Sequence, residues 1–374
     1  MLLRPLVSLG KGIHMNDDFF KYRDRFVLLA KQIEVDETDN DYVIATYGKL
    51  HAGKNELIGA LLAGQMNIAS FTGEVCSYVY GSENDNKILQ HHIKYGTQDD
   101  EVTIFYKNGG TEVISREKFI KKIRGFWESN VPLPESVYNF FNRIAHTEMH
   151  CTSAFLRNDI TIVDTIDLID SIPNKPMSSA NVIIFILDAC SLFSMHERDF
   201  ISTYFYEKHM DNVFFAVNRI GQLSDAPMLE SYIKPCVKQH LQKVFEDKNG
   251  RFDEELYGKR VFFVDAYGAL CAKTGEKIKV FAGRRWFEFD ADINETGFLE
   301  FEAALEQYHL ESELQRMAKI YNDNTNNLGH KHRNEFVQTQ NIEVYSQMRL
   351  LLELAYEAVY GEQPTEADLR QLVI

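Results

Sequence analysis

The stretch from Tyr42 to Leu62 constrains the fold of this chain more than any other part of the sequence. It reads YVIATYGKLHAGKNELIGALL, an apolar strand pattern followed by a loop with two glycines and then a helix pattern. Backbone N–H groups of such a loop and of the helix N-terminus converge on one point, where they bind phosphate. The Gly-x-x-x-x-Gly-Lys spacing is typical of a phosphate-binding loop.

The side chains of this loop predict a nucleotide site with an altered metal ligand. We expect Lys54 to reach the β- and γ-phosphates of a bound nucleotide. The next residue in such loops is normally Ser or Thr, whose hydroxyl coordinates Mg²⁺, but here it is Asn55. An amide oxygen is a hard ligand, so Asn55 alone predicts a weakened Mg²⁺ site. The candidate nucleotide-binding residues of the loop are Gly48, Lys49, His51, Ala52, Gly53, Lys54 and Asn55.

Several strands of the predicted fold are apolar throughout and alternate with helices. They are the strands in DYVIATYG, NVIIFILDA, NVFFAVN and RVFFVDAYGAL. This pattern indicates a largely parallel sheet covered on both faces, the α/β fold class of doubly wound P-loop NTPases. We also expect a hairpin that turns at Asn108, Gly109 and Gly110, and a second hairpin between AHTEMHCTS and DITIVDT.

Polar residues end two of these strands. Asp164 ends the strand ITIV, where an acidic residue can hold Mg²⁺ through water. Asn218 ends VFFAV, and we expect it at the carboxyl edge of the sheet, contacting the base, with Arg219 beside it. Asp164 and Asn55 are therefore the candidate metal ligands.

Two further features of the sequence, the segment HTEMH and Trp286, are interpreted as structural and not as parts of a site. His146, Glu148 and His150 in HTEMH would share one face of a strand, and we interpret them as the solvated face of an edge strand. Their order is not that of the zinc motif His-Glu-x-x-His. Trp286 is expected to be a core or rim residue.

Both ends of the chain have helical patterns. Near the N-terminus, Tyr22, Phe26, Leu29 and Ile33 form an apolar stripe. After Gly297 two further stripes follow, Leu310, Leu314, Met317 and Tyr321, and then Tyr345, Met348, Leu352, Ala355 and Val359, with a polar stretch between them. We expect the N-terminal helix to pack against this C-terminal module.

Composition excludes some classes of function. The formal charge of −15 disfavours broad contact with nucleic acid. No apolar run approaches the roughly 18 to 20 residues that a membrane helix requires. The five cysteines are widely spaced, odd in number and without a Cys-x-x-Cys pair, which favours reduced thiols in a cytoplasmic protein.

The ordered motifs resemble the GTPase domain of bacterial dynamin-like proteins. The resemblance rests on GKLHAGKNELIGALLAG, ITIVDTIDLIDS, NVIIFILDACSLFSMHERDFI, NVFFAVNRIGQL and VFFVDAYGALCAK. TGFLEFEAALEQYHLESELQRMAK is similar to the passage into the helical neck of that family. The resemblance implies a neck helix at 15–40, a GTPase-like domain at 41–296 and a C-terminal neck segment at 297–374.

The same resemblance implies GTP or GDP as ligand, with Mg²⁺, and association with a copy of the chain or with a second dynamin-like protein. Because the chain ends at Ile374, before the long stalk that family members carry, we expect any membrane contact to be indirect, through a partner.

Four motifs depart from the family pattern. Beside Asn55, Asp167 replaces a glycine whose N–H meets the γ-phosphate, and Gly221 replaces the carboxylate that pairs with guanine. A carboxylate about 4 Å from that phosphate costs on the order of 4 kcal/mol at an effective dielectric of 20. In the switch region, Asn86 and Lys87 stand in place of a Thr pair.

These departures predict weak nucleotide binding, little preference for guanine, and hydrolysis that is slow or absent. Two alternatives stay open. One is an active dynamin-type GTPase in which Asn55 and nearby groups replace the lost ligands. The other is a non-catalytic assembly module that partners a stalk-bearing protein.

Overall fold

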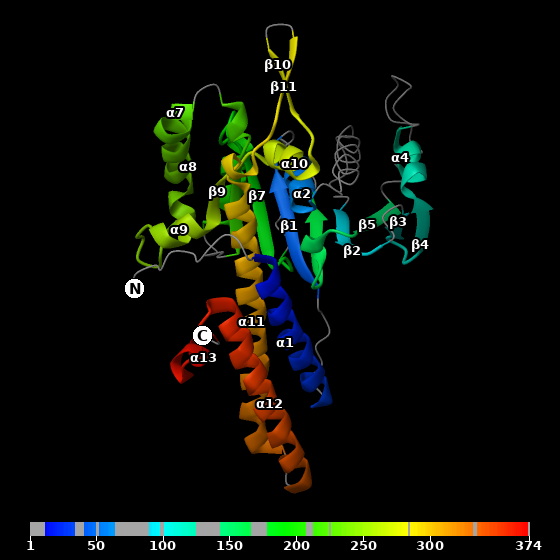
Figure 1. Cartoon of the computed structure of the whole chain (residues 1–374), viewed down its shortest axis with the longest axis vertical. Helices are drawn as coiled ribbons and strands as arrows, with labels where there is room; N and C mark the ends of the chain where they lie inside the picture. The colour runs from blue at the N-terminus through cyan, green and yellow to red at the C-terminus, as the bar shows by residue number, and fades with distance from the viewer. Residues whose placement is uncertain are drawn as a thin grey trace. The chain divides into compact units, whose positions relative to one another are not determined.

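The chain folds into two compact units. The computed structural model describes residues 12–33, 41–49, 52–63, 90–97, 101–124, 143–165, 178–206, 212–223, 226–282, 285–331 and 335–372. One unit, Asp41–Glu302, contains all the strands of this described part and is called the α/β unit below. The other combines Met1–Asn40 with Ala303–Ile374 and is called the helical unit. Figure 1 shows the elements of both units.

The α/β unit is built on one large mixed sheet. In the described residues its nine strands lie in the order β4-β3-β5-β2-β6-β1-β7-β8-β9. The run from β6 through β1, β7 and β8 to β9 is parallel throughout, which confirms the predicted mainly parallel α/β sheet. The strands are β1 Tyr42–Gly48, β2 Gln90–Tyr95, β3 Glu101–Tyr106, β4 Thr111–Ser115, β5 Ile144–Cys151, β6 Ile160–Asp164, β7 Val182–Asp188, β8 Val213–Asn218 and β9 Val261–Phe263.

Helices connect these strands. They are α2 Lys54–Leu61, α4 Arg116–Arg124, α6 Met195–Tyr204, α7 Ala226–Met228, α8 Lys234–Leu241, α9 Glu254–Arg260 and α10 Ala266–Thr274, with a π-helical turn at Leu229–Ile233. Ser194 caps α6 with a full capping box, since its hydroxyl accepts from Glu197 N and the Glu197 side chain accepts from Ser194 N.

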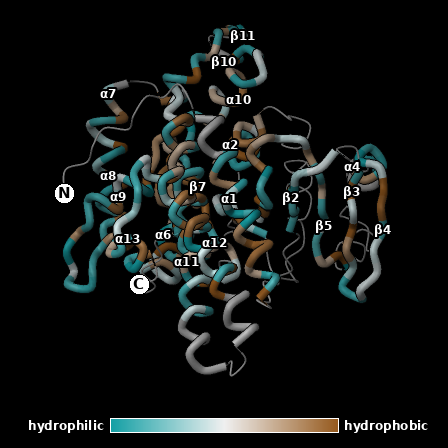
Figure 2. The backbone as a smooth tube through the Cα atoms, turned by 60° about the horizontal axis from the view of Figure 1, so that its bottom comes forward, coloured by the Kyte–Doolittle hydropathy of each residue, from teal (hydrophilic) through white to brown (hydrophobic). Residues whose placement is uncertain are grey.

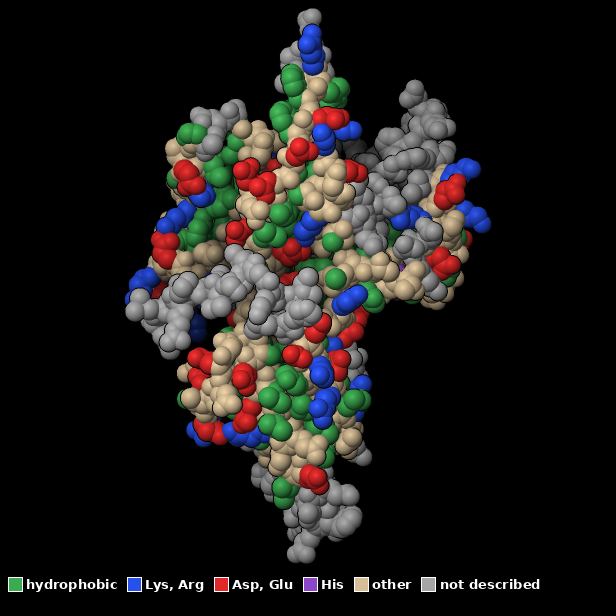
Figure 3. Space-filling model, in the orientation of Figure 1, with side chains coloured by type: hydrophobic (Ala, Val, Ile, Leu, Met, Phe, Trp, Pro, Cys, Tyr) green, Lys and Arg blue, Asp and Glu red, His purple; other side chains and the backbone are tan. Residues whose placement is uncertain are grey.

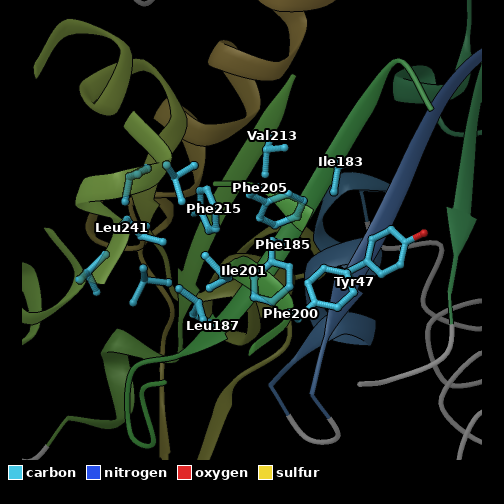
Figure 4. Close-up of a cluster of buried hydrophobic side chains, with 14 of the residues drawn as sticks. Tyr47, Ile183, Phe185, Leu187, Phe200, Ile201, Phe205, Val213, Phe215 and Leu241 are labelled. Atoms are coloured by element: carbon cyan, nitrogen blue, oxygen red, sulfur yellow. The ribbon is translucent and has the colours of Figure 1, made fainter. Parts of the chain in front are cut away.

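The central strands are apolar because both faces of the sheet are covered. Every residue of β7 and of β8 is buried. On one face, Phe185 and Phe215 from the sheet meet Phe200 and Phe205 from α6 and its end, with ring centroids 5.4–5.9 Å apart (Figure 4). Figure 2 shows hydrophobic segments of the chain around β7. This core fixes the strand ends that form the candidate site.

The two predicted hairpins have different outcomes. The first is confirmed, since β3 and β4 pair antiparallel and Gly109 has a φ of 86° in the turn. The second is wrong, because β5 and β6 are not neighbours in the sheet. Strand β2 lies between them, parallel to β5 and antiparallel to β6. A strand from elsewhere in the chain displaces the local pairing that the sequence suggested.

Strand β5 is therefore internal, and the edge-strand interpretation of HTEMH is wrong. The ring of His146 is stacked between Phe105 and His92, at centroid distances of 4.4 and 4.5 Å. Glu148 pairs with Lys94 at 3.2 Å and with His150 at 3.3 Å. These side chains pack and pair with one another on the sheet surface, and the described residues contain no group of three or more His, Cys, Asp or Glu placed to hold a metal.

A small hairpin carries exposed apolar side chains. Strands β10 Ile278–Ala282 and β11 Arg285–Phe289 pair only with each other. Trp286 on β11 is 68% exposed, so the prediction of a core or rim position is wrong. Figure 3 shows acidic and basic side chains interspersed on the face of the α/β unit that it displays.

The helical unit has its own core. It comprises α1 Gly12–Gln32, most of α11 Phe298–Lys331, α12 Glu335–Tyr360 and α13 Glu366–Gln371. The two C-terminal stripes are confirmed, since Leu314, Met317, Met348 and Ala355 are at most 1% exposed. Helix α11 continues to Lys331, through much of the polar stretch expected to interrupt it.

The N-terminal stripe is confirmed, because predicted Phe26 is fully buried and Tyr22, Leu29 and Ile33 are partly buried against the same core. Phe19, which the stripe did not include, is also fully buried. The helix does pack on the C-terminal module as predicted, against α12. No helix among the described residues is long and apolar enough to cross a membrane.

Candidate functional site

Two glycines flank the loop between β1 and α2, where the sequence predicts phosphate binding. Gly48 ends β1, and a Cβ there would lie 2.9 Å from the carbonyl oxygen of Ile186 on β7. Gly53 has a φ of 87°, which favours glycine, and directly precedes α2. Leu57 N donates to Gly53 O, so the first turn of α2 begins at that glycine. Predicted site residue His51 lies outside the described residues.

Lys54 lies at the base of this loop, next to the end of β6. It is 5% exposed, and its ammonium donates to Thr165 O at 2.5 Å. The same nitrogen lies 3.5 Å from Oδ1 of Asp164, which is fully buried. Thr46 Oγ1 also donates to Asp164 Oδ1, at 3.3 Å, because β1 and β6 place these residues side by side. The structure thus brings the predicted lysine and the predicted acid together.

Both predicted metal ligands carry oxygen atoms of the kind that Mg²⁺ prefers. Asn55 follows Lys54 in the first turn of α2 and is half-buried. Asp164 supplies a carboxylate and Asn55 an amide oxygen, both of which suit Mg²⁺. Two protein oxygens are few for an octahedral ion, so Mg²⁺ fits here only together with water and ligand oxygens.

Asn218 joins the phosphate loop to the start of α10. Its Nδ2 donates to Ala52 O at 2.9 Å and to Gly53 O at 3.4 Å. Its Oδ1 accepts from Ala266 N at 2.9 Å. Both polar atoms of this buried amide are therefore bonded to backbone, and Asn218 positions the loop. The contact of Asn218 with a base stays a prediction.

The other two predicted basic residues converge on Asp188, which sequence reasoning missed. Arg219 Nη1 lies 3.3 Å and Lys49 Nζ 3.9 Å from Asp188 Oδ2. Lys49 Nζ also donates to Ser191 O at 2.5 Å. The signal was available, because Asp188 ends a buried parallel strand as Asp164 does. Arg219 has a φ of 70°, an uncommon conformation for a residue other than glycine.

His91 is a second residue that the sequence did not single out. It lies on β2 opposite Asp164, and its Nδ1 is 2.5 Å from Thr147 Oγ1. Burial, with smaller contributions from His92 and Lys54, lowers the pKa of His91 to about 3. His91 is therefore neutral near pH 7 and adds no charge beside Lys54.

Gly221 and Asp265 are neighbours in the structure. A Cβ on Gly221 would lie 2.1 Å from Asp265 Oδ2. Asp265 caps α10, since its Oδ1 accepts from Gly268 N at 3.2 Å. Burial raises the pKa of Asp265, and its bonds from Gly268 and Tyr267 backbone N–H groups act in the opposite direction. A carboxylate therefore lies beside the position where the sequence lacks one. Asp167, Asn86 and Lys87 lie outside the described residues.

Comparisons with known proteins find similar solved structures but no similar sequence family. No protein-family model and no curated protein matches the chain. Two solved chains from an oligomerised bacterial dynamin pair, described as a mechanism for long-range sensing and tethering of membranes, are similar in structure. The first is 18% identical, with a TM-score of 0.46, and the match covers 92% of this chain and 52% of that one. The second is 16% identical, with a TM-score of 0.48, covering 98% and 64%.

The chain thus spans between about half and two thirds of the length of these two solved chains. The likeness to these chains is one of fold.

Proposed function

We propose that this chain is a dynamin-like P-loop protein that binds a nucleotide, GTP or GDP, weakly and hydrolyses it slowly or not at all. The observation that carries the proposal is the position of Lys54. Its ammonium lies directly after a glycine loop at a helix N-terminus, beside the buried acid at the end of β6. Fixed N–H groups and a buried cation together are suited to phosphate.

Weak binding follows from what Lys54 already contacts. Its ammonium donates to Thr165 O and faces Asp164, so a phosphate must compete with oxygens already in place. Arg219 and Lys49 are the two further basic residues expected at the nucleotide. Arg219 pairs with Asp188, and Lys49 lies near the same carboxylate. Much of the positive charge near the loop is therefore already compensated before a ligand arrives.

Mg²⁺ would be held by Asp164 and Asn55 with water and phosphate oxygens. A bound Mg²⁺ neutralises phosphate charge during phosphoryl transfer. Because the protein supplies few ligands, we expect affinity for nucleotide to depend only modestly on Mg²⁺.

The expectation of slow hydrolysis is based on the sequence. Asp167 places a carboxylate where the family has a glycine whose N–H meets the γ-phosphate, and Asn86 and Lys87 lack the hydroxyls that would hold Mg²⁺ and the attacking water. Because the repulsion from Asp167 concerns the terminal phosphate, a diphosphate should bind at least as tightly as a triphosphate.

A titration with fluorescent GTP, GDP and ATP analogues, with and without Mg²⁺, tests this proposal. We expect measurable binding by the unmodified protein and none by Lys54→Ala. Lys54→Gln, which keeps a donor toward Thr165 O, should fold and also fail to bind. The control is Lys259→Ala, which removes an exposed lysine paired only with Glu255 among the described contacts. Affinity that is unchanged in both Lys54 variants would contradict the site.

The same preparation distinguishes the alternatives. Clear steady-state GTP hydrolysis, lost in Lys54→Ala, would favour the active GTPase. The absence of any nucleotide binding would favour the non-catalytic assembly module. Association with a second copy or with a second dynamin-like protein, with any membrane contact made through that partner, is proposed from the motif resemblance. Analytical ultracentrifugation with and without nucleotide tests self-association.

A further inference from the structure

The hairpin of β10 and β11 projects from the α/β unit. Its two strands pair with each other from Ile278–Phe289 to Ala282–Arg285, and they pair with no other described strand. Figure 1 shows the hairpin extending past α10. With five residues in each strand, the hairpin is about 15 Å long. A flat surface can therefore touch the hairpin while the rest of the unit stays at a distance.

Apolar side chains are exposed on both faces of this hairpin. Val280 lies opposite Phe287, and these two side chains share one face with Phe289. Trp286 is next to Phe287 in the strand and so lies on the other face. Val280 is 43%, Phe287 46%, Phe289 54% and Trp286 68% exposed. A protein docked on one face would leave the other face in water, whereas a lipid interface surrounds both.

The exposed apolar area is too small for a stable dimer formed through the hairpin. At these exposed fractions the three aromatic side chains offer on the order of 400 Å². Two copies would then bury about 800 Å², whereas a stable protein interface buries about 1,200 Å² or more. The area therefore favours a lipid surface over a second copy of the chain.

The charges of the hairpin leave a positive group beside the exposed tryptophan. Lys279 lies 4.0 Å from Glu288, and Lys277 lies 3.8 Å from Asp290, so both acids have a basic partner. Arg285 is exposed and has no acidic partner among the described contacts. Figure 3 shows basic and hydrophobic side chains together on this projection. Tryptophan beside a basic residue is typical of the membrane–water interface, and anionic headgroups attract the basic residue.

The length of the hairpin reduces the repulsion between an anionic surface and the acidic chain. The formal charge of the whole chain is −15. Charges in physiological salt are screened over about 8–10 Å, which is shorter than the hairpin. The local positive charge of the hairpin therefore decides the electrostatics of a contact made through it alone.

We propose that the β10–β11 hairpin binds an anionic lipid surface, with Trp286, Phe287 and Phe289 inserted at headgroup level and Arg285 paired with acidic headgroups. The outer edges of the two strands carry backbone N–H and C=O groups that need water or headgroups as partners. The hairpin therefore stays out of the hydrocarbon core. This contact is direct, unlike the contact through a partner expected from the motifs, and it does not depend on nucleotide binding.

Tryptophan fluorescence of the full chain tests direct contact with lipid. Trp127→Phe leaves Trp286 as the single tryptophan of the sequence. On vesicles of phosphatidylcholine and phosphatidylserine in equal parts, its emission should shift to the blue and be quenched by brominated lipids. Vesicles of phosphatidylcholine alone should bind about fivefold more weakly, and added salt should reduce this difference.

Co-sedimentation with the same vesicles tests the side chains. Trp286→Ser should lower the affinity at least about tenfold, and Arg285→Glu at least about fivefold on the anionic vesicles. The matched control is Tyr232→Ser, since Tyr232 is an aromatic residue of the same unit and is 60% exposed. It should leave the affinity unchanged. Because all three residues are exposed, the melting temperature should stay that of the unmodified protein.

Three results would overturn the proposal. An emission spectrum unchanged by vesicles, or an affinity unchanged in Trp286→Ser, would remove the lipid contact. Equal binding to both kinds of vesicle would remove the anionic preference. Self-association without vesicles that is lost in Trp286→Ser and kept in Tyr232→Ser would assign the hairpin to a second copy of the chain instead.

Discussion

The α/β unit and the helical unit bury polar side chains for different purposes. In the α/β unit, Asp164 and Asn218 end parallel strands and bond side chains and backbone of the phosphate loop and its surroundings. In the helical unit, Arg23 on α1 lies 3.7 Å from Glu313 on α11, which also pairs with Arg316 at 2.7 Å. The first arrangement fixes the loop of the proposed nucleotide site, whereas the polar groups of the second pair only with one another and link two helices.

Breaking the ion pairs among Arg23, Glu313 and Arg316 in the helical unit should have the largest effect on stability. Glu313→Ala removes the buried acid that Arg23 and Arg316 share, and breaking a buried ion pair costs about 3 kcal/mol or more. We expect this loss in urea unfolding of the helical unit, with nucleotide affinity unchanged. Replacing both partners, as Arg23→Met with Glu313→Leu, should restore most of the stability because apolar pairs of similar size pack without the desolvation cost.

The exposed pair Lys259–Glu255 provides the control for this experiment. Glu255→Ala should change the free energy of unfolding by no more than about 0.5 kcal/mol. A loss below about 1 kcal/mol in Glu313→Ala would show that the helices are aligned by their apolar core alone.

Removing the Asn218 amide, which bonds the loop to the start of α10, should have an intermediate effect on stability and a large effect on nucleotide binding. Asn218→Ala leaves Ala266 N and Ala52 O without their partner, at a cost of about 2–4 kcal/mol for the two groups. We expect a lower melting temperature and a nucleotide affinity reduced at least about tenfold, because the loop loses its anchor. Asn212→Ala, at the opposite end of β8, removes a bond to Ala180 O and should leave affinity unchanged.

If Asn218→Ala binds nucleotide as tightly as the unmodified protein, the loop holds its shape without this amide. The contrast between Asn218, which would support a ligand site, and the ion pairs of Glu313, which stabilise two helices, would then not hold.

Acidification should have the smallest of these effects and should act on both units. Burial, followed by Arg23 and Arg316, lowers the pKa of His309 to about 3 from the 6.5 of an exposed histidine. The folded state therefore binds its proton less readily than the unfolded state. The resulting stability is complete above about pH 6.5 and falls as the pH drops toward 3, by about 2 kcal/mol at pH 5.

His309→Gln should flatten this dependence in the helical unit, measured by hydrogen exchange of α12 peptides between pH 7 and pH 5. The α/β unit should keep its own dependence, since burial also lowers the pKa of His91 to about 3 and of His92 to about 4. An unchanged slope for α12 in His309→Gln would indicate that other groups govern the acid response.

Local patterns predicted which residues of the candidate site lie together at Lys54, because most of them are contiguous in the sequence. The strand, the glycine loop and Lys54 lie within 21 consecutive residues. Asp164 was recognised because it ends a buried strand. Asp188 carries the same signal and was missed. The bond of Asn218 to the loop and the packing of Asp265 against Gly221 could not be predicted, because these partners are distant in the sequence.

The sequence by itself determined the class of fold and the position of a glycine loop between a buried strand and a helix. Continuous apolar strands that alternate with helices are visible in the sequence itself. So is the glycine at position 53, where the backbone has a φ of 87°. Only the tertiary structure decided which strands are neighbours. Strand β2 lies between β5 and β6 and makes HTEMH internal, since pairing depends on the free energy of the whole sheet. The same long-range packing placed the carboxylate of Asp265 against Gly221.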